Sequence, residues 1–177
     1  MEWMWIAGAL VASYLVGSLS FAVILSRIFG LADPRSYGSG NPGATNVLRS
    51  GNRQAAVLTL VFDALKGFVP VLLCLAFGER VGLTPVTAAW VGLAAFVGHL
   101  WPVFFGFKGG KGVATAAGVL MAWNPLLAVA TLASFAIIVF FTRYVSLGSI
   151  VAAAFAPFYQ ALIWDDSPAL LALVIMS

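Results

Sequence analysis

Charged residues and sulfur or imidazole ligands are scarce in this chain. Only 8% of its residues are charged, and its 177 residues include one cysteine and one histidine. A single cysteine excludes an intrachain disulfide, and without a Cys/His cluster the usual zinc ligand sets are excluded. A net charge of +3, scattered along the chain, is too small for a nucleic-acid footprint. We therefore expect no metal, no cofactor, no bound nucleic acid and no obligate protein partner.

Apolar residues dominate what remains. Hydrophobic residues make up 62% of the chain, and the mean hydropathy of +1.04 is typical of an integral membrane protein. A helical span needs roughly 20 residues, so the chain has room for six or seven spans and no separate soluble domain. The sequence predicts an all-α fold, a polytopic membrane helix bundle that forms a single domain over residues 1–177.

Seven apolar runs follow one another along the chain. The first has neither a basic n-region nor a small-residue cleavage site, so we interpret it as a retained span and not as a signal peptide. The last run has about ten apolar residues before Ser177, too few to cross a bilayer, so we expect the natural C-terminal end to be missing. The runs cover residues 1–25, 55–77, 86–105, 113–123, 126–141 and 145–164, and the seventh begins after Pro168.

The basic residues predict the orientation of these spans. If the N-terminus is outside, alternation of seven spans places nearly every loop arginine and lysine on one side. By the positive-inside rule that side is cytoplasmic. The residues on it are Arg27, Arg35, Arg49, Arg53, Lys108, Lys111 and Arg143, and only Arg80 falls on the other side.

Two polar, glycine-rich segments, residues 38–46 and 107–112, interrupt the apolar sequence on the predicted cytoplasmic face. They combine backbone donors, hydroxyls, amides and basic side chains, groups that can converge on phosphate oxygens. The first segment matches G-x-G-x-x-G, but it follows a membrane helix and contains Pro42, which argues against a dinucleotide-binding unit. A turn-rich connector, and lysines that only anchor the chain at the headgroups, are the alternatives. Two such segments on one face favour a phosphate-handling site.

Spacing within these segments suggests individual roles. Arg49 follows Asn46 by three positions, so a compact loop can direct a guanidinium, an amide and a nearby hydroxyl at one ligand. His99, near the cytoplasmic end of its run, is either a hydrogen-bonded structural histidine or a proton-transfer residue. The catalytic candidates are Ser39, Asn41, Arg49, Lys108 and His99. The candidates for substrate and phosphate binding are Gly40, Gly43, Thr45, Asn46, Gly109, Gly110, Lys111, Gly112 and Ser146.

Asp63 and Lys66 are ionisable residues inside an apolar run. They are three positions apart, so they can pair along one face of a helix. Intramembrane charges are functional candidates by default, and an orienting ion pair is the interpretation we favour.

These motifs closely resemble those of the bacterial acyl-phosphate-dependent glycerol-3-phosphate acyltransferases. The resemblance is carried, in order, by GSGNPGATNVLR at 38–49, DALKG at 63–67, GHLWPVFFGFKGGKGVAT at 98–115 and RYVSLGS at 143–149. It implies a seven-helix inner-membrane enzyme of phospholipid synthesis with a cytoplasmic active site. Such an enzyme transfers a fatty acyl group from acyl phosphate to the 1-hydroxyl of glycerol 3-phosphate, giving lysophosphatidic acid and phosphate. The family also carries a C-terminal stretch with His and Asn that lies beyond Ser177.

Two other functions remain open at this point. A small anion or phosphate transporter could use the same basic loops, and a non-catalytic scaffold is a third possibility. Transporters usually show inverted repeats and broken helices near the bilayer midplane. We find no convincing internal repeat, and the polar residues cluster at one face, so the acyltransferase is the favoured function.

Overall fold

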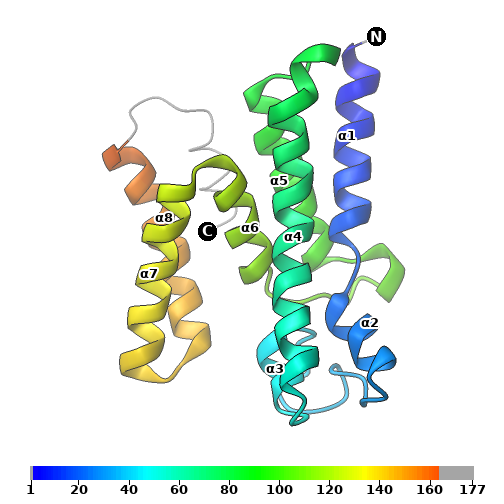
Figure 1. Cartoon of the computed structure of the whole chain (residues 1–177), viewed down its shortest axis with the longest axis vertical. Coiled ribbons are helices and arrows are strands. Elements are labelled where there is room, and N and C mark those ends of the chain that lie inside the picture. Colours follow the sequence, from blue (N-terminus) through cyan, green and yellow to red (C-terminus); the bar gives the residue numbers. More distant parts are fainter. Residues whose placement is uncertain (1, 164–177) are drawn as a thin grey trace.

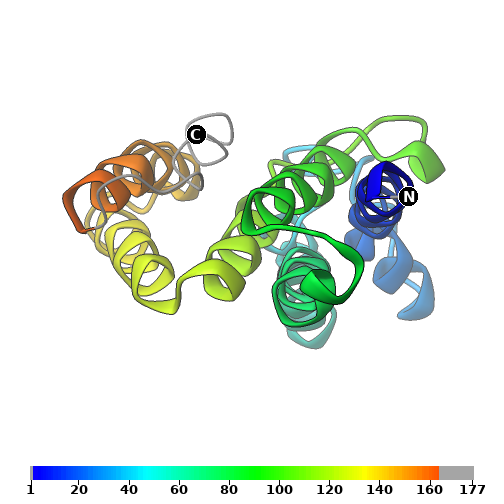
Figure 2. The ribbon, with the colours of Figure 1, turned by 90° about the horizontal axis from the view of Figure 1, so that it is seen from above.

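The computed structural model describes residues 2–163, and this part of the chain is all-helical (Figure 1). Its helices are α1 (Glu2–Gly17), α2 (Phe21–Ile28), α3 (Ala44–Leu48), α4 (Arg53–Phe77), η1 (Gly78–Val81), α5 (Pro85–Leu100), η2 (Val103–Phe105), α6 (Val113–Trp123), α7 (Pro125–Thr142) and α8 (Val145–Ile163). In Figure 2, α1, α4 and α5 form one group, α7 and α8 form a pair, and α6 connects the two. The expected all-α architecture is confirmed for the described residues.

Four helical segments are long and apolar enough to cross a membrane. They are Arg53–Val81, Pro85–Phe105, Pro125–Thr142 and Val145–Leu162, and the bent pair α1–α2 can supply a fifth. Large apolar side chains on their outer faces are exposed, among them Leu73 and Ile137. Exposed apolar surface on this scale is expected for helices that face lipid.

The first apolar run is not the single helix that we predicted. α1 ends at Gly17, and α2 leaves at an angle of 43° after a break of three residues. Glycine and serine favour such a break because glycine is a poor helix former and serine hydroxyls compete for backbone groups. The Lys66 ammonium then donates to the carbonyl of Leu19 at 2.7 Å, a backbone oxygen within the break.

The run at 113–123 forms a helix too short to be the predicted fourth span by itself. Eleven residues extend only about 16 Å, roughly half of the hydrocarbon thickness of a bilayer. This helix, α6, packs closely along α4: Gly67 lies against the carbonyl of Thr115, and Gly118 against the carbonyl of Ala64. Small residues permit this backbone approach. The predicted seventh span lies outside the described residues.

Glycines also bring α1 and α5 together. Gly17 faces the carbonyl of Ala95, Gly98 faces the carbonyl of Tyr14, and the Ser13 hydroxyl donates to the carbonyl of Val91 at 2.6 Å. These contacts fix the C-terminal end of α5, from which the second glycine-rich segment departs.

Candidate active site

The loop at residues 38–46 is organised by Asn46. Its side chain is 2% exposed and accepts a hydrogen bond from the backbone N–H of Ser39 at 3.1 Å. Its amide nitrogen donates to the carbonyls of Pro34 at 2.6 Å and Tyr37 at 3.1 Å. Asn46 therefore holds the loop in shape, and its donors and acceptor are already used by backbone groups.

Gly38 allows Asn46 and Arg49 to fold against the same backbone. Gly38 has a φ of +58°, and a side chain there would meet Asn46 Oδ1 and lie 3.1 Å from the Cδ and Nη1 atoms of Arg49. Ser39 and Arg49 are exposed on this loop. No hydrogen bond or ion pair within residues 2–163 engages either side chain, so both can bind a ligand.

The second segment, residues 107–112, passes closely beside the end of α5. Gly110 donates its N–H to the carbonyl of His99 at 3.2 Å. A side chain at Gly109 would collide with the carbonyls of His99 and Leu100, and one at Gly110 would collide with His99 Nε2. The same position at Gly110 lies 3.0 Å from the carbonyl oxygen of Pro42. The two glycine-rich segments therefore meet at Gly110.

Gly112 leads from this segment into α6. It has a φ of +76°, packs against the ring of Phe96 and stands at the N-cap position, where it has no side chain with which to cap the helix. The first N–H groups of a helix lack intrahelical partners and carry partial positive charge. The start of α6 can therefore receive an anion, with Lys111 beside it.

Arg35, paired with Asp33, links the stretches of chain that precede the two segments. The Arg35 guanidinium pairs with the Asp33 carboxylate, with Nη2 to Oδ2 at 2.7 Å, and its Nη1 donates to the carbonyl of Phe105 at 3.3 Å. The hydrogen bond from Arg35 holds the pKa of Asp33 below its ordinary value. The charge pattern predicted Arg35 on the cytoplasmic side, but it did not predict the hydrogen bond from Arg35 to the carbonyl of Phe105.

A buried polar cluster lies behind the glycine-rich segments. The exposed fractions of its members are 3% for Asp63, 4% for Lys66, 0% for Thr115 and 7% for His99. Lys66 Nζ lies 2.9 Å from Asp63 Oδ1, which confirms the predicted ion pair. The Thr115 hydroxyl donates to the Asp63 carbonyl at 2.9 Å and lies 3.2 Å from His99 Nδ1. His99 is thus a buried, hydrogen-bonded residue that also faces Gly110.

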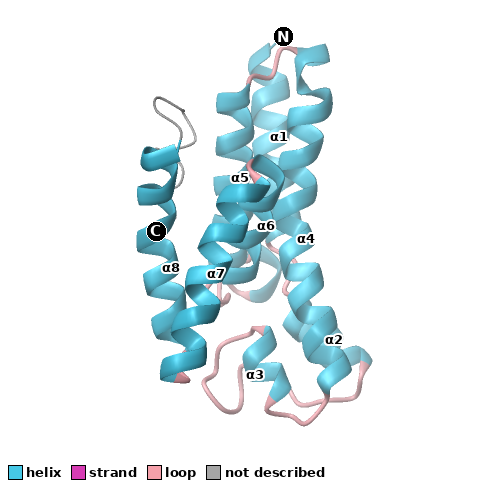
Figure 3. Ribbon diagram, turned by 60° about the vertical axis from the view of Figure 1, so that its left-hand side comes forward, coloured by secondary structure: helices cyan, strands magenta, loops and turns pink. Residues whose placement is uncertain are grey.

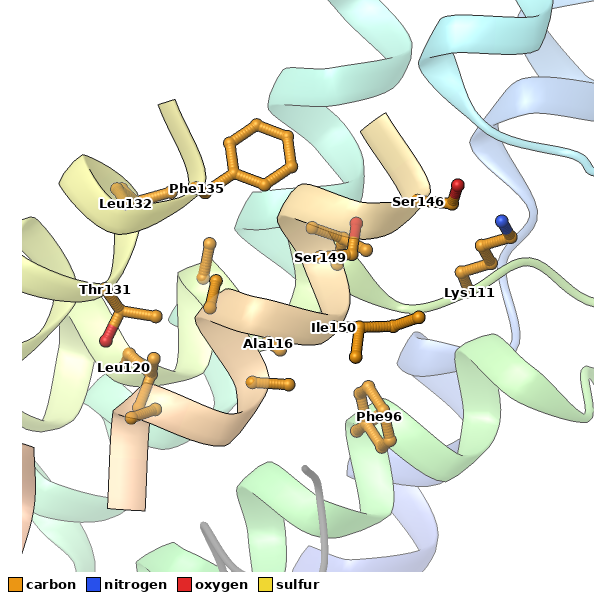
Figure 4. A pocket seen from close by; sticks show the side chains of 15 residues that line it. Phe96, Lys111, Ala116, Leu120, Thr131, Leu132, Phe135, Ser146, Ser149 and Ile150 are labelled. Atoms are coloured by element: carbon orange, nitrogen blue, oxygen red, sulfur yellow. The ribbon is translucent and has the colours of Figure 1, made fainter. Parts of the chain in front are cut away.

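An apolar cavity of about 420 Å³ adjoins this region, between α5, α6, α7 and α8. Its walls include Phe96, Leu120, Phe135 and Ala153. Figure 4 shows the Lys111 amine and the Ser146 hydroxyl at one end of the cavity, with Leu120 and Thr131 toward the other. Lys111 directly follows Gly110, so this end of the cavity lies beside the meeting point of the two segments.

The glycerol-3-phosphate acyltransferase family matches residues 7–177 of this chain. The chain belongs to that family. It is 59% identical to the glycerol-3-phosphate acyltransferase of Paraburkholderia phytofirmans, over 94% of this chain and 78% of the relative. It is 60% identical to that of Cupriavidus necator, over 85% and 75%.

Solved structures of PlsY, an integral membrane glycerol 3-phosphate acyltransferase, are also similar. The glycerol 3-phosphate form has a TM-score of 0.88 and 37% identity, covering 97% of this chain and 84% of that one. The lysophosphatidic acid form has a TM-score of 0.87 and 36% identity, covering 97% and 83%. The resemblance seen in the motifs and the assignment as an enzyme are confirmed, and the transporter loses its support.

The structure of the acyltransferase sorts the predicted site residues into three groups. The first loop carries Ser39, Gly40, Asn41, Gly43, Thr45, Asn46 and Arg49, and the second carries Lys108, Gly109, Gly110, Lys111 and Gly112. Ser146 and Lys111 line the same end of the cavity, and His99 lies against Gly110. Lys108 is exposed, and within residues 2–163 its side chain has no hydrogen bond or ion pair to the first loop. Within the same range, no group of three or more His, Cys, Asp or Glu side chains is arranged to hold a metal.

Thr115 and Arg35 were not among the predicted site residues. Thr115 is a polar residue in an apolar run, four positions after Lys111, and that pattern is the signal that could have identified it. Arg35 donates to the carbonyl of Phe105, 70 positions away in sequence, and no local sequence pattern predicts such a contact.

Proposed function

We propose that this enzyme transfers a fatty acyl group from acyl phosphate to the 1-hydroxyl of glycerol 3-phosphate, releasing lysophosphatidic acid and inorganic phosphate. The observation that carries the proposal is the contact between the two glycine-rich segments at Gly110, beside the end of an apolar cavity that Lys111 lines. Both substrates carry phosphate, and one also carries a fatty chain. PlsY structures with glycerol 3-phosphate and with lysophosphatidic acid support the choice of acceptor and product.

Basic side chains and backbone N–H groups together hold the two phosphates. Arg49, Lys108 and Lys111 supply positive charge, and the N-terminus of α6 supplies N–H donors. Ser39 and Asn41 orient the glycerol hydroxyl or the acyl carbonyl. Supporting contacts come from Gly40, Gly43, Thr45, Gly109, Gly112 and Ser146, while Asn46 acts by bracing the loop.

The acyl transfer is direct. The glycerol 1-hydroxyl oxygen forms an ester bond with the acyl carbonyl carbon, the bond from that carbon to the phosphate oxygen breaks, and phosphate departs with the bonding pair. The hydroxyl proton goes to His99 Nε2 or to a substrate phosphate oxygen. Acyl phosphate is already activated, so positioning and neutralisation of the leaving phosphate supply much of the catalysis. Within residues 2–163 no Ser-His-acid triad is formed, so no acyl-enzyme is expected.

Purified enzyme given acyl phosphate and glycerol 3-phosphate tests the function. Lysophosphatidic acid, detected by mass spectrometry, should appear in equal amounts with inorganic phosphate. Parallel reactions with acyl-CoA, or without glycerol 3-phosphate, serve as controls. Transport of phosphate into vesicles without any lysophosphatidic acid would overturn the proposal.

The cavity is proposed to hold the acyl chain. It extends along α8 from Ser146 to Ala156, roughly 15 Å, which suits a long apolar chain. Ala153 lines it, whereas the neighbouring Ala154 is exposed on the outer face of α8.

Filling this cavity should change the chain-length preference of the enzyme. A buried methylene contributes about 0.8 kcal/mol, and the added ring should exclude several methylenes of a long chain, so Ala153→Phe should lower kcat/KM for a palmitoyl donor by about tenfold or more relative to an octanoyl donor. Ala154→Phe is the matched control and should keep the wild-type ratio. Kinetics with acyl phosphates of both lengths provide the measurement, and an unchanged ratio in Ala153→Phe would exclude the cavity as the acyl site.

We further propose a single-domain, seven-span inner-membrane protein with its N-terminus outside and its active site on the cytoplasmic face. In Figure 3, α3 and its flanking loops lie at the same end of the bundle as the α7–α8 turn, and the N-terminus lies at the other end, which agrees with this topology. α6 and the loop before it together make one crossing, because irregular backbone is tolerated at membrane depth where protein surrounds it.

Thiol labelling should report this orientation. Cys74, the only cysteine, is buried, and a Cys74→Ala background allows single cysteines to be introduced. Ser50→Cys and Phe107→Cys should resist an impermeant maleimide in intact cells and react in inverted vesicles. Glu79→Cys, in η1, should show the opposite pattern as a control. Labelling of Ser50→Cys from outside would refute the topology.

A further inference from the structure

We propose that Thr115 is a positioning residue that fixes the tautomer of His99, so that Nε2 presents its lone pair at the point where the two glycine-rich segments meet. The assignment of the tautomer depends only on the geometry of the buried cluster. The catalytic use of Nε2 as a proton acceptor rests on the proposed function.

The tautomer follows from the number of protons available. The Thr115 hydroxyl has one proton, and the carbonyl oxygen of Asp63, 2.9 Å away, can only accept a hydrogen bond. That proton is therefore used, and the Thr115 oxygen must accept from His99 Nδ1 across their 3.2 Å contact. His99 then carries its proton on Nδ1 and a lone pair on Nε2.

The carboxylate of Asp63 does not compete for the His99 proton. Its Oδ1 lies 3.8 Å from His99 Nδ1, beyond hydrogen-bonding distance, and is paired with Lys66 Nζ at 2.9 Å. Lys66 also donates to the carbonyl of Leu19. Lys66 therefore links α4 to the break between α1 and α2, and the backbone carbonyl of Asp63 orients His99 through Thr115.

The other ring nitrogen faces the proposed active site. A Cβ added at Gly110 would collide with Nε2, and the same Cβ position lies 3.0 Å from the carbonyl oxygen of Pro42. No hydrogen bond to Nε2 is formed within residues 2–163. A glycerol hydroxyl held between the two segments can donate to this nitrogen, which would make His99 a catalytic residue and Thr115 the group that sets its orientation.

Nitrogen-15 NMR of the single histidine tests the tautomer directly. His99 is the only histidine in the chain, so protein labelled with ¹⁵N-histidine and purified through a histidine-free tag gives signals from this side chain alone. The wild type should show a protonated Nδ1 and an unprotonated Nε2. A wild-type spectrum with the proton on Nε2 would overturn the proposal without any need for a variant.

Variants then test the role of Thr115. Proton transfer by a positioned side chain contributes about a hundredfold or more, so Thr115→Val should change the tautomer signals and lower kcat by about a hundredfold, with little change in KM, and Thr115→Ser should restore both. The matched control is Thr59→Val, because Thr59 is equally buried but bonds only the carbonyl of Ala55 in its own helix. Unchanged tautomer signals in Thr115→Val would overturn the proposal even if activity falls. If the wild type produces no lysophosphatidic acid, the proposed function fails while the tautomer result still stands.

Discussion

Replacing Arg49 with alanine is expected to lower kcat/KM by about a hundredfold to a thousandfold while the enzyme still inserts and purifies. Removal of one preorganised donor that acts in the transition state commonly costs about 2.7 to 4 kcal/mol. Arg49 is exposed and makes no side-chain hydrogen bond or ion pair within the described residues, so its loss should not unfold the loop that Asn46 braces. Steady-state kinetics with both substrates measure the effect.

Two substitutions define the specificity of this result. Arg53→Ala removes an exposed arginine from the start of α4, on the same predicted face, and should leave kcat/KM within about twofold of wild type because surface charges away from a site contribute little. Arg49→Lys keeps the charge but loses the planar guanidinium, so an intermediate activity is expected.

Ser39→Ala and Lys108→Ala should each lower kcat/KM about as much as Arg49→Ala does. Near-wild-type turnover in any of these three alanine variants removes that residue from the site.

The all-α fold, the Asp63–Lys66 ion pair and the placement of both glycine-rich segments on one face could be predicted from local sequence patterns. Apolar runs of sufficient length predict membrane helices because an unsatisfied backbone polar group is costly in lipid. The ion pair between Asp63 and Lys66 was predictable because it depends only on helical spacing. The two glycine-rich segments were predicted to share one face from the positive-inside rule, and in the structure they lie against each other at Gly110 and Pro42.

Other features depend on contacts between distant parts of the chain. Lys66 donates to the carbonyl of Leu19 within the break between α1 and α2, 47 positions away in sequence, so hydropathy predicted a retained span without showing the bend. Asn46 was predicted to bind substrate, and no sequence pattern indicated that its amide nitrogen donates to the backbone carbonyls of Pro34 and Tyr37. The bounds of α6 match the predicted apolar run, because the helix begins after Gly112 and ends before Asn124 and Pro125, but its close packing against Ala64 and Gly67 of α4 has no signal in the sequence.

Replacing Gly110 with alanine is expected to lower kcat by about a hundredfold, because misplacement of reacting groups by about 1 Å can cost that much. The added methyl group would overlap His99 Nε2 and crowd the carbonyl of Pro42 at 3.0 Å. The loop can relieve this overlap only by moving away from the first segment or by displacing the imidazole, and either change separates groups that the site brings together.

The expected loss of kcat comes from the clash at position 110 and not from the replacement of a glycine as such. Gly8 provides the control for this distinction. Gly8 in α1 has no heavy atom within 4 Å of the position of an added Cβ, so Gly8→Ala should retain wild-type kinetics. Both variants should be compared by kcat and KM for each substrate, and by thermal unfolding in detergent, since a local clash in a loop should leave the helical bundle folded. If Gly110→Ala is folded and turns over at a rate within about threefold of wild type, the two segments do not form the site at this point. If its kcat falls while the thermal stability holds, the contact between Gly110, His99 and Pro42 is part of the catalytic geometry.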